Sequence, residues 1–390
     1  MGARLPRILA ASAGAVVLSA LLAVQAGSSV LTRKQPELSS RLLPVNGLAL
    51  EQQATRQFMS AVKERDDLVP SAQAASPAAL SAISRDPLSP KAYAVLAVAE
   101  QNSDRKRALL DAASKLNRRD LLLQGLVLEE SVAQKNYAAT LATLDMILSV
   151  HPEQKANFFP ILLQALSEKD ALPALSGILD QESEWQEDFF KFAVRKPEVL
   201  TNLAELRLQR ASVSLDVDQR LISGLASAGQ LDKAYEVYRA ANGQSAPASG
   251  KRMILDWRAR LSPFDWELAD EAGFRAQPSA TPDKLEVFVR GGKGGVLASR
   301  NVRLASGPVA LRINHDLTPP VQVEDVRLQL SCPGAEQPFY DEPLRLGSRD
   351  YRIGAKPAAC DFVTIAIHAR AWTGSSAIRG IINRIEILGS

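Results

Sequence analysis

Hydrophobic positions along this chain follow three patterns. An apolar run without charged residues spans Ile8 to Ala26. From 49 to 241, apolar residues recur at the spacing of an amphipathic helix. From 262 to 390 they alternate with polar residues in short segments bounded by Gly, Pro, Asp and Asn, as in strands. The patterns predict a multi-domain α + β protein with an N-terminal membrane helix, an α-solenoid of helical pairs and a C-terminal antiparallel β-sandwich.

The helical region is expected to consist of antiparallel pairs. In "RRDLLLQGLVLEESVAQKNYAATLATLDMILSVHPEQ" (118–154) one helix gives way to a second, and "DQRLISGLASAGQLDKAYEVYRAANG" (218–243) repeats the plan. Both segments resemble tetratricopeptide repeats, whose stacked pairs form a solenoid with a concave surface. The positions that fit the repeat are Tyr137, Leu144 and Pro152 in the first segment, and Gly229, Leu231, Ala234, Tyr238 and Ala241 in the second.

Two segments are expected to separate the regions. Residues 32–48 form a polar linker. Residues 242–261 begin with "NGQSAPASG", which has linker composition, and continue with "KRMILDWRARL", which predicts a short helix.

The region from 262 to 390 is expected to be all β. In "DFVTIAIHAR" the alternation turns Val363, Ile365 and Ile367 toward the core, and the last segment does the same with Ile381, Ile385 and Ile387. The opening "SPFDWEL" and "GFRAQ", with a strand running to the C-terminus, resemble galactose-binding-like jelly rolls, the fold of many carbohydrate-binding modules. The order of the two regions is similar to that of envelope proteins associated with bacterial polysaccharide production.

The N-terminal segment 1–31 predicts export. Arg4 and Arg7 precede the apolar run, and the first acidic residue is Glu37, which is the arrangement of a Sec-type signal. The run is long enough to stay as an inner-membrane anchor, with the bulk of the chain periplasmic. Alternatively, cleavage near Ala26 releases a soluble periplasmic protein.

The two cysteines, Cys332 and Cys360, suit an oxidising compartment, where an even pair predicts one disulfide. The alternative is two buried thiols. Neither has a second ligand at metal-binding spacing, so no metal and no cofactor are expected. The net charge is only +3, from 46 basic and 43 acidic residues, so we expect no nucleic-acid partner.

The glycine run "RGGKGG" (290–295) resembles a phosphate-binding loop only superficially. A P-loop continues with Lys and then Ser or Thr into a helix, whereas Val296 and Leu297 follow here within an alternating strand. We expect a hairpin or bulged turn. Arg290 and Lys293 remain candidates for an anionic ligand.

Catalytic patterns are weak. His151, His315 and His368 are far apart in sequence and are expected to be structural. The sequence has no G-x-S-x-G elbow, and its carboxylate pairs are interpreted as solvated surface, so an enzyme is not predicted.

Aromatic residues offer a second kind of site, because a pyranose has an apolar face that stacks on exposed rings. Trp372, in a loop-like segment, is the first candidate, followed by Tyr340 and Trp266. The alternative is that Trp266 and Trp372 are packing residues.

These features predict an exported scaffold that binds protein partners through its solenoid, in cell-envelope or exopolysaccharide assembly or export. One alternative is a carbohydrate-binding adaptor that uses the sandwich to bind polysaccharide. Another is an enzyme, a lyase or hydrolase, with a cryptic site in the sandwich.

Overall fold

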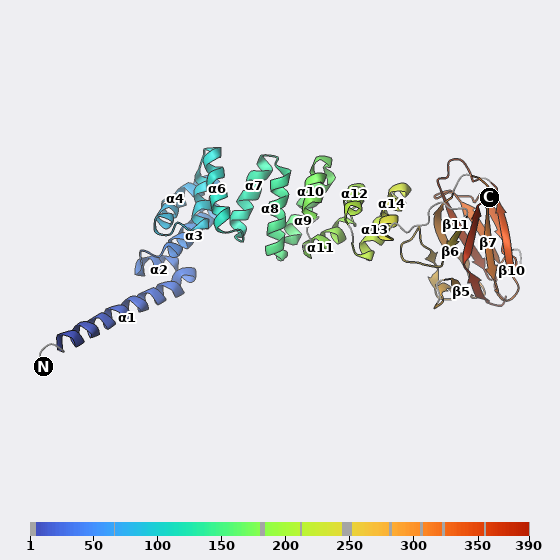
Figure 1. Ribbon diagram of the computed structural model, residues 1–390, viewed down its shortest axis with the longest axis horizontal. Helices are drawn as coiled ribbons and strands as arrows, with labels where there is room; N and C mark the ends of the chain where they lie inside the picture. Colours follow the sequence, from blue (N-terminus) through green and yellow to red (C-terminus); the bar gives the residue numbers. More distant parts are fainter. Residues whose placement is uncertain are drawn as a thin grey trace. The chain divides into compact units, whose positions relative to one another are not determined.

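The computed structural model shows a mixed α + β chain in which helices precede strands (Figure 1), so the predicted fold class is confirmed. It describes residues 5–65, 67–179, 184–210, 213–243, 252–280, 283–304, 307–321, 324–354 and 356–389. Within them the helices are α1 (Leu5–Lys34), α2 (Pro36–Leu42), α3 (Gly47–Arg65), α4 (Leu68–Arg85), α5 (Pro90–Ala99), α6 (Ser103–Leu116), α7 (Leu121–Ala133), α8 (Tyr137–Val150), α9 (Lys155–Ser167), α10 (Leu172–Leu179), α11 (Glu184–Ala193), α12 (Leu200–Gln209), α13 (Leu215–Ser227) and α14 (Leu231–Ala241), with 3-10 turns at Pro152–Gln154, Lys169–Ala171 and Pro197–Val199.

Contacts divide the chain into two compact units. One comprises Met1–Leu162 and Pro173–Trp185, and the other comprises Leu163–Leu172 and Gln186–Ser390. The second unit therefore holds the last helices together with all the described strands. The division into domains at 242–261 stays a prediction, and residues 244–251 of that segment lie outside the described part of the chain.

Helix α1 contains a stretch, Gly14–Lys34, that is long and apolar enough to cross a membrane, judged by length and composition. It spans 21 residues, has a mean hydropathy of 1.8 and is almost entirely unburied. A membrane anchor and a signal peptide are both compatible with this helix.

The predicted linker 32–48 is wrong, because most of it is helical. Ser28 and Thr32 of α1, Ser39 of α2 and Asn46 form a polar cluster in which the two serines and the threonine are buried. The hydroxyl oxygens of Ser28 and Ser39 lie 2.8 Å apart, and Asn46 Nδ2 donates to Ser28 Oγ at 2.8 Å. Polar composition was interpreted as exposure, whereas these side chains satisfy one another in the interior.

The predicted helical pairs are present at both quoted segments, as α7–α8 and α13–α14. Their turns use left-handed backbone, with φ of 55° at Lys135 and 76° at Gly229. Leu144, Ala234 and Tyr238 are buried, whereas Tyr137 is exposed. The resemblance to tetratricopeptide repeats stays a prediction. The other predicted repeat positions are Leu231 and Ala241, which begin and end α14, and Pro152, which begins a 3-10 turn.

The strands form two antiparallel sheets. The order in the eight-stranded sheet is β1-β13-β7-β12-β5-β4-β3, with β10 paired to β7, and in the five-stranded sheet it is β2-β6-β11-β8-β9. The described strands are β1 (Arg252–Leu255), β2 (Glu267–Leu268), β3 (Asp270–Glu271), β4 (Phe274–Pro278), β5 (Lys284–Val289), β6 (Gly294–Arg303), β7 (Val309–His315), β8 (Val326–Ser331), β9 (Tyr340–Pro343), β10 (Gly347–Ile353), β11 (Phe362–Arg370), β12 (Ile378–Asn383) and β13 (Ile385–Gly389).

The sandwich core lies between the inner faces of the two sheets. Val363, Ile365 and Ile367 are buried as predicted. Trp257 and Trp266 are also buried, with ring centroids 4.5 Å apart. The predicted disulfide between Cys332 and Cys360 is present, which is typical of a periplasmic or extracellular protein.

Two expectations for this region were wrong. The short helix predicted in "KRMILDWRARL" is instead strand β1, which pairs with β13. The last predicted strand is two strands, β12 and β13, and Ile382 rather than Ile381 is buried in the first of them. The glycine run makes a turn as expected, although it is not a hairpin, because β5 and β6 belong to different sheets.

Candidate functional site

The outer face of the five-stranded sheet carries a row of polar side chains. In β8 the buried residues Val326, Leu328 and Leu330 alternate with half-buried ones, which turns Arg327 and Gln329 outward. In β11 the same alternation turns His368 and Arg370 outward. The register sets Arg327 opposite His368, so these side chains share one surface.

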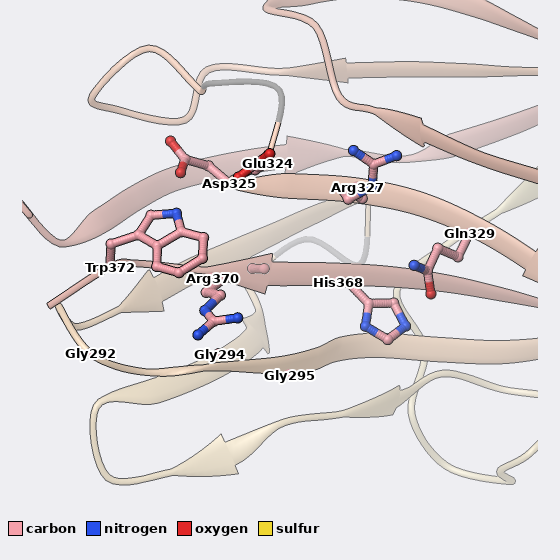
Figure 2. A pocket seen from close by; sticks show the side chains of 11 residues that line it. Gly292, Gly294, Gly295, Glu324, Asp325, Arg327, Gln329, His368, Arg370 and Trp372 are labelled. Atoms are coloured by element: carbon pink, nitrogen blue, oxygen red, sulfur yellow. The ribbon is translucent and has the colours of Figure 1, made fainter.

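This surface is hollowed into a groove of about 640 Å³. Figure 2 shows that its side chains come from β8, β11, the residues before β8 and the loop after β11, while glycines form the opposite rim. The lining residues are Gly292, Gly294, Gly295, Glu324, Asp325, Arg327, Gln329, His368, Ala369, Arg370 and Trp372.

Trp372 is the large apolar side chain of this groove. It is 43% exposed, and the Arg370 guanidinium carbon lies 4.0 Å from the ring centroid. A cation at this distance is attracted by the ring's electron-rich face, which holds the two side chains together. The ring is therefore an aromatic surface in a polar groove, supported from one side by arginine. We call Arg370 and Trp372 the platform.

Asp341 of β9 holds two of the outward polar groups. It accepts hydrogen bonds from Arg327 Nε at 2.7 Å and from Gln329 Nε2 at 3.3 Å. Arg370 makes no ion pair within the described residues. The groove therefore combines a neutralised arginine, a second arginine on the tryptophan and the carboxylates of Glu324 and Asp325.

His368 lies on the floor of the groove, half-buried. Burial lowers its pKa below the ordinary value of 6.5, while Asp341 acts in the opposite direction. The imidazole is therefore neutral at pH 7, and a neutral ring offers one donor and one acceptor nitrogen. Such a group can bond a hydroxyl in either direction.

A second groove of about 530 Å³ lies on the other side of the glycine rim. It shares Gly292, Gly294 and Gly295 with the first groove. Lys293 lines it, together with carboxylates of β2 and β3. Among the described residues, no group of three or more His, Cys, Asp or Glu side chains could hold a metal ion.

The structure separates the predicted ligand-binding residues. Trp372 lines the first groove and Lys293 the second, whereas Arg290 lines neither and lies against Gly273, whose carbonyl accepts the Arg290 N–H at 2.8 Å. The candidate Trp266 is 1% exposed against Trp257, which is the packing role given as the alternative and not a ligand-binding one.

Tyr340 was also wrongly placed at the ligand surface. It pairs in register with the inward-facing Leu330 and packs against the core. Burial raises the pKa of Tyr340 to about 12. Successive side chains of a strand point to opposite faces of the sheet, so the next residue, Asp341, faces the side of the groove.

Sequence reasoning missed Arg327, Gln329, His368 and Arg370. They occupy the polar positions between Val326, Leu328 and Leu330 and between the apolar residues of "DFVTIAIHAR". The same alternation that predicted the core could have identified them, since the residues not turned inward on adjacent strands must share the outer face. Which strands are adjacent is not written in the sequence.

Neither a protein-family model nor a curated protein matches this chain. Among solved structures it is similar to the carbohydrate-binding module TmCBM61, solved in complex with beta-1,4-galactotriose. The identity is 14% and the TM-score 0.23, over 33% of this chain and 90% of that chain. What the groove can hold follows from its own residues.

Proposed function

We propose that the β-sandwich binds carbohydrate in the groove at Trp372, without catalysis. The observation that carries this proposal is the platform: an exposed indole supported by arginine within a groove of otherwise polar side chains. The C–H face of a pyranose packs on an aromatic ring, and its hydroxyl groups need donors and acceptors around that ring. Gln329 and neutral His368 supply both.

The charges of the groove favour a neutral glycan. Arg327 is paired with Asp341, and the cation of Arg370 is matched by the carboxylates of Glu324 and Asp325 in the same lining. A strongly anionic polysaccharide would meet those carboxylates without an equal excess of cations.

We further propose that the chain is exported, that α1 anchors it in the inner membrane, and that it acts in the cell envelope. The apolar helix and the disulfide support this location. The helical region would then carry the glycan-binding sandwich, as an adaptor in exopolysaccharide assembly or export.

A second candidate function is docking of a protein partner on the helical region. It is supported by large apolar side chains that remain exposed there, at 58% for Leu80, 69% for Leu88 and 53% for Val132. The two functions are compatible, because their surfaces lie on different elements.

Affinity electrophoresis tests glycan binding, with gels containing beta-1,4-galactan, mixed-linkage beta-glucan, xylan or anionic alginate. We expect the wild type to be retarded by a neutral polysaccharide and Trp372→Ala to lose about 2 kcal/mol, roughly 30-fold in affinity. Phe288→Ala is the matched control, since this aromatic residue is 41% exposed and lines neither groove.

Two results would contradict the proposal. One is a wild type that none of the polysaccharides retards. The other is equal retardation of Trp372→Ala and the wild type. Release of new reducing ends from a retarding polysaccharide would instead support the alternative of a cryptic polysaccharide-active enzyme.

A further inference from the structure

The glycine run lies against the segment that carries Trp372. The Gly292 N–H donates to the Ala371 carbonyl at 2.7 Å, and the Ala371 N–H donates to the Lys293 carbonyl at 2.9 Å. Ala371 itself is buried at 2% exposure between the two outward side chains of the platform. Two reciprocal backbone hydrogen bonds thus join the run to the middle of the platform.

Two of the glycines approach the platform more closely than any other residue could. A Cβ on Gly291 would lie 2.8 Å from the Ser375 carbonyl oxygen and 3.3 Å from that of Trp372. A Cβ on Gly294 would lie 2.9 Å from Arg370 Cγ and 3.0 Å from Arg370 Cβ. Carbon atoms in ordinary contact stay about 3.5–4.0 Å apart, so a side chain at either position must displace its neighbour.

The neighbours have little freedom to move away. The Trp372 carbonyl accepts hydrogen bonds from the Ser375 N–H at 3.0 Å and from its hydroxyl at 2.7 Å, which closes the turn above Gly291. The Arg370 N–H is bonded to the Asp325 carbonyl at 2.7 Å. The atoms that a new Cβ would meet at Arg370 belong to the base of its side chain and not to its flexible end.

We infer that Gly291 and Gly294 are positioning residues for the platform: they let the turn after β5 press against Arg370 and the Trp372 turn, and so set the orientation of the indole ring. That the ring binds a sugar rests on the proposed function. A pre-oriented ring loses less conformational freedom when a sugar stacks on it, which improves affinity without adding a contact.

Fluorescence quenching by acrylamide, without any glycan, tests the positioning. All four tryptophans are described, and Trp185, Trp257 and Trp266 are at most 2% exposed, so the quenchable emission comes from Trp372. We expect Gly291→Ala and Gly294→Ala to change the Stern–Volmer constant. Gly354→Ala is the control, because a Cβ there would meet nothing within 4 Å and its φ is not positive.

Affinity for the polysaccharide that best retards the wild type gives the second readout. We expect the two variants to lose about tenfold in affinity, with Gly354→Ala unchanged. Far-UV circular dichroism checks folding. If Gly291→Ala does not fold, Gly294→Ala carries the test alone, because the closest atom it would meet belongs to a side chain.

The outcomes separate this inference from the proposed function. If both variants fold and have the Stern–Volmer constant of the wild type, the inference is overturned, regardless of their affinity for glycans. Altered quenching with unchanged affinity for a retarding polysaccharide overturns the link between orientation and binding. A wild type that binds none of the four polysaccharides defeats the proposed function, while the quenching still decides the positioning.

Discussion

Burial keeps two histidines of the sandwich neutral, at positions with different surroundings. His315 is 2% exposed at the end of β7, where burial lowers its pKa and the Arg345 backbone and Asp316 act in the opposite direction. His368 is half-buried in the groove, with a pKa lowered by the same cause. The first can affect only stability, whereas the second also faces the ligand surface.

The buried histidine makes the sandwich sensitive to acid. When the chain unfolds, His315 regains a pKa near 6.5, so below that pH the unfolded state binds a proton that the folded state resists. The free energy of unfolding therefore falls as the pH drops below about 6.5. We expect His315→Leu to show a flatter fall in melting temperature between pH 7 and pH 5, measured by circular dichroism.

A parallel pH dependence of His315→Leu and the wild type would assign the acid sensitivity to other groups.

At the residue scale, the sequence did not separate exposed tryptophans from buried ones. Trp372 was a ligand-binding candidate with packing as the alternative, and it is 43% exposed in a segment rich in Gly and Ser between two strands. Trp266 follows a similar turn, yet it is buried against Trp257, nine residues earlier in a stretch mistaken for a helix. Because the segment with Trp257 was interpreted as a helix outside the sandwich, nothing in the sequence indicated that Trp257 would pack on Trp266.

Helix α14 contacts the sandwich through two tyrosine side chains. Tyr235 places its ring centroid 5.2 Å from that of Phe264 and 5.5 Å from that of Phe362, the first residue of β11. Tyr238, one turn later, donates its hydroxyl to Asp265 at 2.9 Å. This contact explains why the last helices and the strands form one compact unit.

The Tyr238–Asp265 hydrogen bond is expected to stabilise that contact. Burial raises the pKa of Tyr238, so its hydroxyl stays protonated and able to donate to the carboxylate, which is 3% exposed. Tyr238→Phe should lower the free energy of unfolding by about 1.5–3 kcal/mol, because it leaves a buried carboxylate without one donor. Urea unfolding followed by the emission of the buried tryptophans measures the change.

Tyr235→Phe is a close control, since this residue lies on the same helix and in the same ring cluster and its hydroxyl has no hydrogen bond in the described residues. Equal destabilisation by both changes would show that ring packing, and not the hydrogen bond, stabilises the contact.

Helices and strands were largely predictable, but their partners were not. Local periodicity identified α7, α8, α13 and α14, and it also identified β8 and β11. It could not show that β5 and β6 enter different sheets, since a tight glycine turn is equally suited to a hairpin. The groove depends on that crossing, because the glycine run leads from β5 into β6, where Gly294 pairs with Arg370 of β11 in the five-stranded sheet.

For the whole molecule, the fate of the N-terminal helix determines where the proposed glycan-binding groove is located. If α1 is retained, the groove stays attached to the membrane; if the chain is cleaved near Ala26, it is a soluble protein. The sequence left both alternatives open, and the structure is compatible with either. Whether α1 is retained or removed depends on cleavage of the chain by the cell and not on the fold.

We expect the full-length chain to fractionate with membranes, to resist extraction by carbonate and to begin at its own N-terminus by mass spectrometry. A chain starting at Gly27, expressed behind a cleavable signal, is the matched control and should be soluble. A mature protein lacking residues 1–26 would contradict the anchor.

The docking function has a separate test, a pull-down from detergent-solubilised membranes with the wild type and with Leu88→Asp.

The polar cluster at the end of α1 has a mechanical consequence. A flexible linker of the length of 32–48 would have a root-mean-square end-to-end distance of about 23 Å, which would let the following helices move independently of α1. Hydrogen bonds from Asn46 to Ser28 and Thr32 instead fasten the start of α3 to α1. If α1 is a membrane anchor, the connection between α1 and α3 is therefore rigid, and tilting α1 in the bilayer would tilt the first helices with it.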